Sequence, residues 1–213
     1  MKLTNKLNKF LRIFFIFIFF IFNSLSYIKA NDVKDFEIEG MSIGDSLLDY
    51  MDEGMILNEI EDRDISVFYE DKYIGISTWD IRDQYELYDD VGVTFKTNDK
   101  DYEIYAIEGT LHMEEDSNIQ ECHDKQNEIV NEMSQLFNNI EPQTWFVPKD
   151  QLDPEEISVK YIEFNLKDGG KFRTICYEIQ KGIREYSDIN LLYVTLDSKE
   201  FVDYIRNRWN YLI

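Results

Sequence analysis

Short runs in which apolar and polar residues alternate follow one another through much of the chain. Polar turns separate these runs between residues 65 and 111, and the same texture returns between residues 158 and 196. Alternation with a period of two, rich in β-branched and aromatic residues, is typical of strands that bury one face. The turn Asp168-Gly169-Gly170 favours a tight hairpin, because glycine accepts a positive φ. The pattern therefore predicts antiparallel hairpins.

Two other segments repeat apolar residues every three or four positions and predict amphipathic helices. The clearer one spans residues 117–137, where Ser117 and Gln120 fit a capping box and Gln126 is the only polar residue of the apolar stripe. The second begins near Ser198 and closes the chain. Both follow a group of predicted strands.

A third helix is predicted over residues 42–55, after a short strand that ends at Gly40. Ser42 and Asp45 have the spacing of a capping box, and Ile43, Leu47, Leu48, Met51 and Met55 follow a period near 3.6. On this pattern Ile43, Leu47 and Leu48 point inward.

The order of these elements, hairpins and then a helix in each half, predicts an α+β fold with a mainly antiparallel sheet packed by the central and the C-terminal helix. Residues 31–213 are long enough to form a single domain. Residues 142–154 hold all three prolines and predict an irregular connection. The repeated order also allows two similar lobes, 31–141 and 155–213.

The N-terminus carries the features of a secretory signal peptide. Residues 1–12 contain four cations and no acid, and the next ten residues, 13–22, are all apolar. This run is about half of the ~20 residues that span a bilayer as a helix, so we expect no permanent membrane anchor. Cleavage is expected after Ala30, with Ser26 as the alternative. The mature chain is expected to be exported and soluble.

Charge narrows the partners that the exported chain could bind. The sequence has 22 basic and 43 acidic residues and a net charge of −21. Residues 1–30 hold five of the basic residues and no acid, so their removal leaves a net charge near −26. Such a field repels nucleic acids and favours cations or basic partners. The scarcity of alanine beside abundant Ile, Asn and Phe is typical of an AT-rich bacterial genome, and we expect the periplasm, or secretion.

The two cysteines are expected to form a disulfide. Cys122 lies on the apolar face of the predicted central helix and Cys176 lies in a predicted strand, so a helix packed on a sheet would bring them together. An even number of cysteines in an exported chain supports this pairing. Two alternatives remain: buried free thiols, and a reactive Cys122 thiolate beside His123 near a helix N-terminus.

Residues 44–47 read Gly-Asp-Ser-Leu, which resembles the signature of the GDSL lipases and esterases. The resemblance implies Ser46 as a nucleophile, with a histidine base and oxyanion donors. No histidine follows His123, and the expected Asp-x-x-His is absent. Ser46 is therefore a weak candidate, and we expect it on the polar face of the predicted helix.

Metal sites are also weakly indicated. His112 with Glu114 or Glu115 approximates one pair of zinc ligands, but a second pair is missing. Asp99, Asp101 and Glu103 alternate as calcium ligands could, without the glycine and the final glutamate of an EF-hand. Dispersed carboxylates could also form a glycosidase pair, with no specific signal. We expect no cofactor.

Trp145-Phe146-Val147 is the only apolar cluster within the predicted proline-flanked loop. It is expected either to pack back onto the fold or to anchor a partner, since exposed aromatic anchors mark interfaces. It is the candidate partner-binding segment.

Several segments together resemble a family of small exported bacterial proteins without an assigned activity. They are FEIEGMSIGDSLLDYM, YEIYAIEGT, CHDKQNEIVNEMSQLF, TICYEI and DSKEF. The resemblance implies export, paired cysteines and a shared fold, and it supplies no catalytic residue. We therefore expect a non-catalytic protein that binds a protein partner or a small ligand in the cell envelope. A periplasmic hydrolase using Ser46 or dispersed carboxylates is the alternative.

Overall fold

The computed structural model of the protein describes residues 32–61, 67–69, 72–114, 118–137, 139–147, 157–179 and 190–209. The predicted signal peptide, residues 1–30, lies outside these ranges. None of the described helices is both long and apolar enough to cross a membrane.

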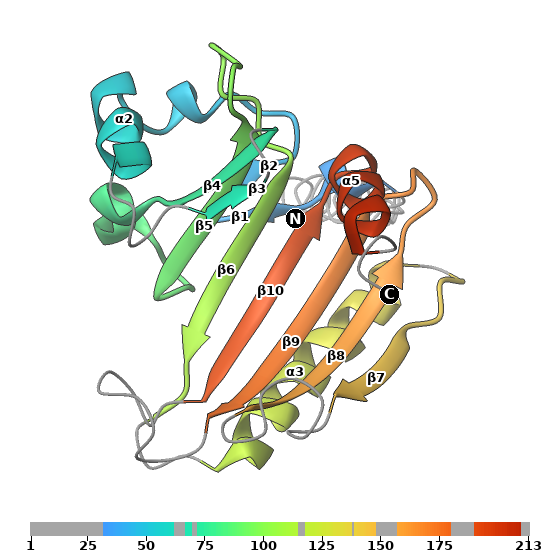
Figure 1. Cartoon of the computed structure of the whole chain (residues 1–213). Coiled ribbons are helices and arrows are strands. Elements are labelled where there is room, and N and C mark those ends of the chain that lie inside the picture. The colour runs from blue at the N-terminus through green and yellow to red at the C-terminus, as the bar shows by residue number, and fades with distance from the viewer. Residues whose placement is uncertain are drawn as a thin grey trace, which may run out of the picture.

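Eight strands form one antiparallel sheet in the order β3-β4-β5-β6-β10-β9-β8-β7 (Figure 1). In chain order the strands are β3 (Val67–Tyr69), β4 (Tyr73–Ser77), β5 (Asp90–Lys96), β6 (Ala106–His112), β7 (Gln143–Val147), β8 (Ile157–Asn165), β9 (Lys171–Ile179) and β10 (Leu191–Asp197). Strands β3 to β6 and strands β7 to β10 are two consecutive meanders, and the pairing of β6 with β10 joins them into a continuous sheet.

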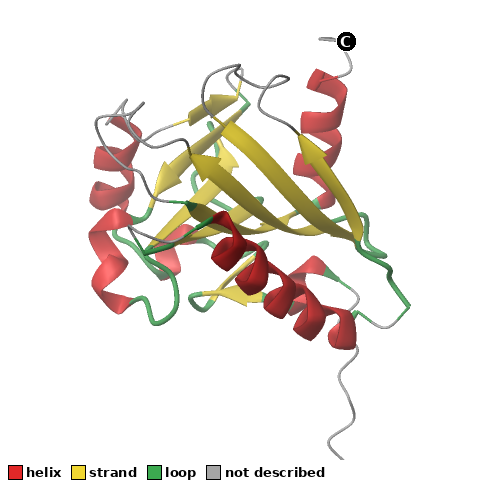
Figure 2. Cartoon of the chain, turned by 90° about the horizontal axis from the view of Figure 1, so that it is seen from below, coloured by secondary structure: helices red, strands yellow, loops and turns green. Residues whose placement is uncertain are grey.

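Two long helices lie on opposite sides of this sheet (Figure 2). Helix α3 (Ile119–Leu136) follows the first meander and packs on β9 and β10 of the second. Helix α5 (Lys199–Trp209) follows the second meander and packs through Phe201 on Tyr73 and Ala106 of the first. These contacts confirm the predicted α+β fold with an antiparallel sheet and two packing helices.

The main hydrophobic core lies on the side of the sheet that α3 covers. Buried side chains of β4, β5, β6, β8, β9 and β10 meet there with those of the N-terminal segment. Gln126, the polar residue in the apolar stripe of α3, is buried because its amide nitrogen donates to the backbone oxygens of Lys160 and Thr174, both at 3.1 Å. These hydrogen bonds offset part of the cost of burying the amide, whose oxygen has no hydrogen-bond partner among the described residues.

The N-terminal segment differs from the predicted helix over residues 42–55. It contains β1 (Glu37–Ile38), β2 (Met41–Ser42), the 3-10 helices η1 (Val33–Asp35) and η2 (Leu47–Asp49), and helix α2 (Glu53–Glu61). The helix prediction is wrong because Gly44 has a φ of 94°, and its backbone N–H donates to the oxygen of Ile104 instead of to a helical turn. Leu47 is buried as expected, whereas Leu48 is exposed.

The prediction of an irregular connection over residues 142–154 is also wrong in part. Residues 143–147 form strand β7, which pairs with β8 at one edge of the sheet. Proline is tolerated at the ends of an edge strand, and Pro142 and Pro148 flank this one. Residues 148–154 lie outside the described ranges. The remaining described element, the 3-10 helix η3 (Trp79–Gln84), connects β4 to β5.

Candidate functional site

The side of the sheet opposite the main core is called here the open face. Helix α5 lies in front of its upper part in Figure 1. The strand register places Arg173 of β9 beside Thr195 of β10, and Thr195 beside Glu108 of β6. Residues that are direct partners in adjacent strands point to the same face. Three polar side chains therefore form a row across the middle of the open face.

A hollow of about 260 Å³ lies over this row and is called here the sheet cavity. Gly75 and Gly92 lie on its floor, where the absence of a side chain leaves space. A Cβ atom added at Gly92 would meet only the backbone oxygen of Ile76, at 3.6 Å. The remaining lining residues are Ile76, Ser77, Asp90, Val93, Thr94, Ala106, Ile107, Glu108, Thr110, Arg173, Ile175, Thr195, Asp197 and Phe201.

Arg173 and Asp197 form a salt bridge at one end of the cavity. The guanidinium Nη2 donates to Asp197 Oδ2 at 2.5 Å, and the aspartate side chain is only 3% exposed. The nearby Asp197 carboxylate raises the pKa of Arg173, and partial burial opposes this only in part. The ion pair therefore brings little net charge to the cavity.

Glu108 has a different environment, although it is a neighbour of this pair. Burial raises its pKa to about 7, with further increases from the negative charges of Asp197 and Asp90 and a decrease from Arg173. Within the described part of the chain, no group donates a hydrogen bond to its carboxylate. Glu108 therefore gains and loses a proton near neutral pH, where an ordinary glutamate is ionised.

Two further polar atoms lining the cavity lack hydrogen bonds among the described residues. They are Nε of Arg173 and Oγ1 of Thr195, both buried. Buried polar atoms are nearly always paired with protein, water or a ligand. The sheet cavity therefore offers a donor, a hydroxyl and a titratable carboxyl group to a molecule that enters it.

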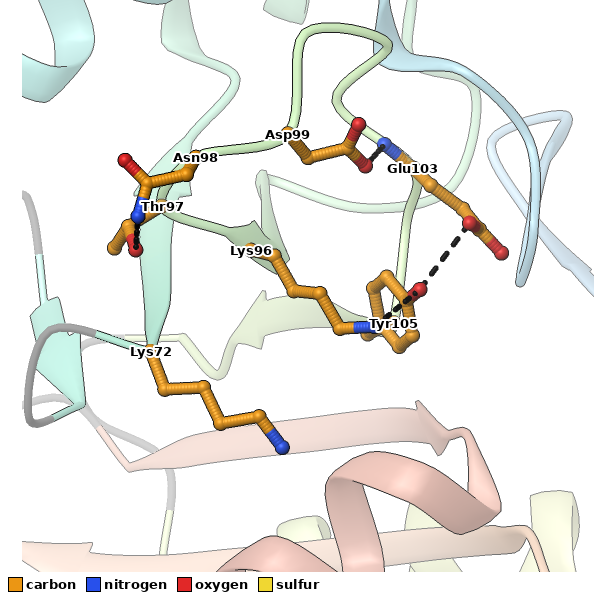
Figure 3. Close-up of a pocket in the computed structure, with 7 residues that line it drawn as sticks. All are labelled: Lys72, Lys96, Thr97, Asn98, Asp99, Glu103 and Tyr105. Carbon is orange, nitrogen blue, oxygen red and sulfur yellow. Dashed lines mark hydrogen bonds between the residues drawn. The ribbon is translucent and has the colours of Figure 1, made fainter.

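A wider and more open hollow of about 560 Å³, called here the lysine pocket, lies beside Lys72 and Lys96 (Figure 3). Lys96 Nζ donates to the Tyr105 hydroxyl at 2.8 Å and to Glu200 Oε2 at 3.1 Å, and Lys72 lies 3.5 Å from the same carboxylate. The Tyr105 hydroxyl donates to Glu103 at 3.2 Å. The cations are therefore neutralised within the protein, which makes this pocket a weaker candidate for binding an anion.

The hydroxyl of Ser46 makes structural hydrogen bonds. It donates to the backbone oxygen of Asp101 at 2.5 Å and accepts from the N–H of Leu48 at 3.3 Å, which caps η2. Ser46 is thus not on a helix face as expected. The geometry shows a capping residue that also ties η2 to the 99–103 turn.

The metal candidates lie at the ends of β5 and β6. The carboxylate of Asp99 accepts from the backbone N–H groups of Asp101 and Glu103, and the backbone N–H of His112 donates to Asp89. Glu114 is exposed, and Glu115 is outside the described residues. In the described ranges no three His, Cys, Asp or Glu side chains gather in a way that could hold a metal ion.

The cysteine prediction is confirmed. Cys122 of α3 and Cys176 of β9 form a disulfide with an S–S distance of 2.10 Å and a Cα–Cα distance of 6.1 Å. Both residues are buried, in a cluster with Leu192. The alternatives of free or reactive thiols are therefore wrong for this structure.

The predicted partner-binding segment lies in strand β7. Trp145 stacks on Tyr161 of β8 with ring centroids 5.9 Å apart and an interplanar angle of 22°. Trp145 remains 39% exposed and Phe146 56%, while Val147 is half-buried. The segment therefore packs on the sheet and still presents aromatic surface, and its role as a partner anchor stays a prediction.

Sequence reasoning did not single out Glu108, Arg173 and Asp197. Each occupies a polar position in an alternating strand, and such positions usually face solvent. The only signal of a site in the sequence was the presence of Gly75 and Gly92 in strands next to these charged residues. A glycine within a strand often marks a place where a ligand or another chain segment comes close to the backbone. No known protein family, curated protein or solved structure matches this chain.

Proposed function

We propose that this chain is an exported bacterial protein that binds a small ligand in the sheet cavity and does not catalyse a reaction on it. Export is supported by the apolar run at residues 13–22 and by the Cys122–Cys176 disulfide, since disulfides persist in oxidising compartments. The periplasm is the compartment we propose, with the ligand or an envelope protein as partner.

The observation that carries the proposal is the set of polar atoms in the cavity that the described residues leave without partners. Thr195 Oγ1 and Arg173 Nε are buried, and the Glu108 carboxylate receives no hydrogen bond. Concave sites with a few convergent polar groups and a perturbed pKa are the usual location of ligand binding. The volume of about 260 Å³ lies below the ~300–1,000 Å³ typical of sites for drug-sized molecules, so the ligand should be small.

The test is thermal unfolding of the purified protein with a panel of small amines, amino acids and sugars. Gly92→Leu should fill the cavity, and Thr195→Val should remove the hydroxyl at nearly constant volume. Gly54→Ala is the matched control, because nothing lies within 4 Å of a Cβ at this exposed helix position. If the cavity binds a ligand, at least one compound of the panel should raise the unfolding temperature of wild type and of Gly54→Ala. The same compound should have a smaller effect on Gly92→Leu and Thr195→Val. Equal shifts in all four proteins, or no shift with any compound, would overturn the proposal.

Hydrolysis is the second candidate, because burial raises the pKa of Glu108 to about 7 and the Asp197 carboxyl group lies nearby. A carboxyl group with this pKa can act as a general acid. If the protein hydrolyses ester or glycoside reporters and Glu108→Gln abolishes this activity, the protein is a hydrolase and the binding proposal is wrong. Turnover abolished by Ser46→Ala instead would support the serine-hydrolase alternative.

A further inference from the structure

We propose that the sheet cavity takes a small organic amine, bound as its ammonium ion between Glu108 and Asp90. This proposal rests on the proposed binding function and names the class of ligand for the same cavity.

The charge of the lining favours a cation. Three carboxylates line the cavity, those of Asp90, Glu108 and Asp197, against one guanidinium, that of Arg173. The salt bridge between Arg173 and Asp197 accounts for two of these four groups. Glu108 and Asp90 remain, and they lie on the neighbouring strands β6 and β5. An anionic ligand would have to overcome this excess of negative charge, whereas an ammonium group compensates it.

The hydrogen bonds of the cavity suit an ammonium group, which has only donors. Glu108 receives no hydrogen bond from the described residues, and the Thr195 hydroxyl, its cross-strand neighbour, can accept one. Asp90 Oδ1 accepts from the Ser77 hydroxyl at 2.8 Å and from its neighbour's backbone N–H at 2.9 Å, which holds the carboxylate in place. The acceptors of Glu108, Thr195 and Asp90 therefore line the space in which the cation would lie, and the unpaired Nε–H of Arg173 belongs to the salt bridge with Asp197.

The apolar part of the lining separates an organic amine from a bare metal ion. Ile175, Ala106 and Phe201 line the same cavity. A short hydrocarbon chain would bury its surface against them. A metal ion would gain nothing from these residues, and the described residues bring no three metal-binding side chains together.

Binding of a cation should displace the proton of Glu108. The titratable groups near Glu108 are Asp197 of β10, Arg173 and Tyr177 of β9, and Asp90 of β5. Helix α5 contributes the uncharged Phe201 to the same cavity. Because Glu108 is half protonated near pH 7, ammonium binding at lower pH must expel a proton. Affinity should therefore increase about tenfold between pH 6 and pH 8, the change in the ionised fraction of a single group with a pKa near 7.

The experiment is calorimetric titration with butylamine and butane-1,4-diamine at pH 6 and pH 8, with butan-1-ol as the uncharged probe of matched length. We expect amine binding that is about tenfold tighter at pH 8, with proton release measured from the buffer dependence of the heat. Glu108→Gln should weaken amine binding at pH 8 by at least tenfold and remove the pH dependence. Glu103→Gln, a carboxylate change in the lysine pocket, is the control and should leave both unchanged.

Three outcomes would overturn the proposal. Butan-1-ol could bind as tightly as butylamine, Glu108→Gln could leave amine affinity unchanged, or neither amine could bind. If a neutral compound of the thermal panel still stabilises the wild type but not Gly92→Leu, the binding function stands and only the ligand class fails. Circular dichroism of Glu108→Gln checks that the variant is folded.

Discussion

Cys122 and Cys176 are bonded across the interface between α3 and β9, and they join the helix that follows the first meander to a strand of the second. The bond closes a loop with a sequence separation of 54. A closed loop restricts the unfolded chain, so the bond acts mainly by reducing the entropy gained on unfolding. It connects the two halves of the chain covalently at a buried site.

Reduction of this disulfide should lower the free energy of unfolding by about 4 kcal/mol, from the loop-entropy argument. The measurement is urea unfolding of the wild type with and without reductant. The double variant Cys122→Ala and Cys176→Ala should lose at least as much, because it also removes two buried sulfur atoms. Equal unfolding midpoints for oxidised and reduced protein would contradict the prediction.

Gly109→Ala should destabilise the protein by about 1–3 kcal/mol, the usual cost of overpacking. A Cβ atom at Gly109 would lie 2.5 Å from the ring of Tyr88, so the ring must move. Thermal or urea unfolding measures the change. Gly54→Ala is the control and should stabilise by roughly 0.5–1 kcal/mol, because Gly54 lies in α2 with no atom near the added carbon.

A double-mutant cycle tests whether the Tyr88 ring causes this cost. In a Tyr88→Ala background, Gly109→Ala should be less destabilising by at least ~0.5 kcal/mol, since contacting residues are not additive. Additive effects of the two substitutions would show that another contact is responsible.

Glu39→Gln should destabilise the protein by roughly 1 kcal/mol, as expected for charged hydrogen bonds at a site that water partly reaches. The Glu39 carboxylate accepts three backbone N–H groups, those of Glu86, Leu87 and Tyr88, at 2.7 to 2.9 Å. Partial burial raises the pKa of Glu39, but the three donors together outweigh this effect, so the pKa is lowered overall.

The sign of the Glu39 pH dependence follows from that lowered pKa. Its contribution to stability is fully present above the ordinary pKa of 4.5 and is lost as the pH falls through the lower pKa of the folded state. The difference in urea midpoint between wild type and Glu39→Gln should therefore shrink below pH 4.5. A difference that stays constant down to pH 3 would argue against the carboxylate as its source.

Glu108 should have the opposite pH dependence, because its pKa is raised to about 7 in the folded protein. Between the ordinary value near 4.5 and pH 7 the folded state binds more protons than the unfolded state, so stability falls as the pH rises through this window. Glu108→Gln should remove the loss and be more stable than wild type at pH 8, by on the order of 1–3 kcal/mol. Urea unfolding at pH 5 and pH 8 measures the stability difference between wild type and Glu108→Gln. Parallel pH profiles of stability for the two proteins would refute the prediction.

Ser46→Ala should destabilise the protein by about 1 kcal/mol, the usual effect of removing a helix cap. The loss has two sources, the cap of Leu48 N–H and the hydrogen bond to the Asp101 backbone oxygen. Ser46→Thr keeps a hydroxyl and should recover part of the stability in thermal unfolding. Equal losses in the two variants would show that the hydroxyl is not the stabilising group.

Local patterns in the sequence determined much of the secondary structure. Alternation predicts the strands around Val93 and Phe172, and the 3.6 period predicts α3 and α5, because these periodicities depend on which face of a single element is buried. The same reasoning placed Cys122 and Cys176 on surfaces that face each other. The sequence predicts the secondary structure of a segment correctly where the apolar positions of its pattern are the positions that the fold buries.

Only the tertiary structure decided the remaining elements and the cavity. The spacing of Leu47 and Leu48 fits a helix, but hydrogen bonds with residues 102–104 hold that backbone in another conformation. Trp145 joins an edge strand because β8 offers it backbone partners. Glu108 and Arg173 meet through strand registers with β10, which join residues far apart in the sequence. Long-range pairing of this kind leaves no local period, which is why the sequence alone did not reveal the cavity.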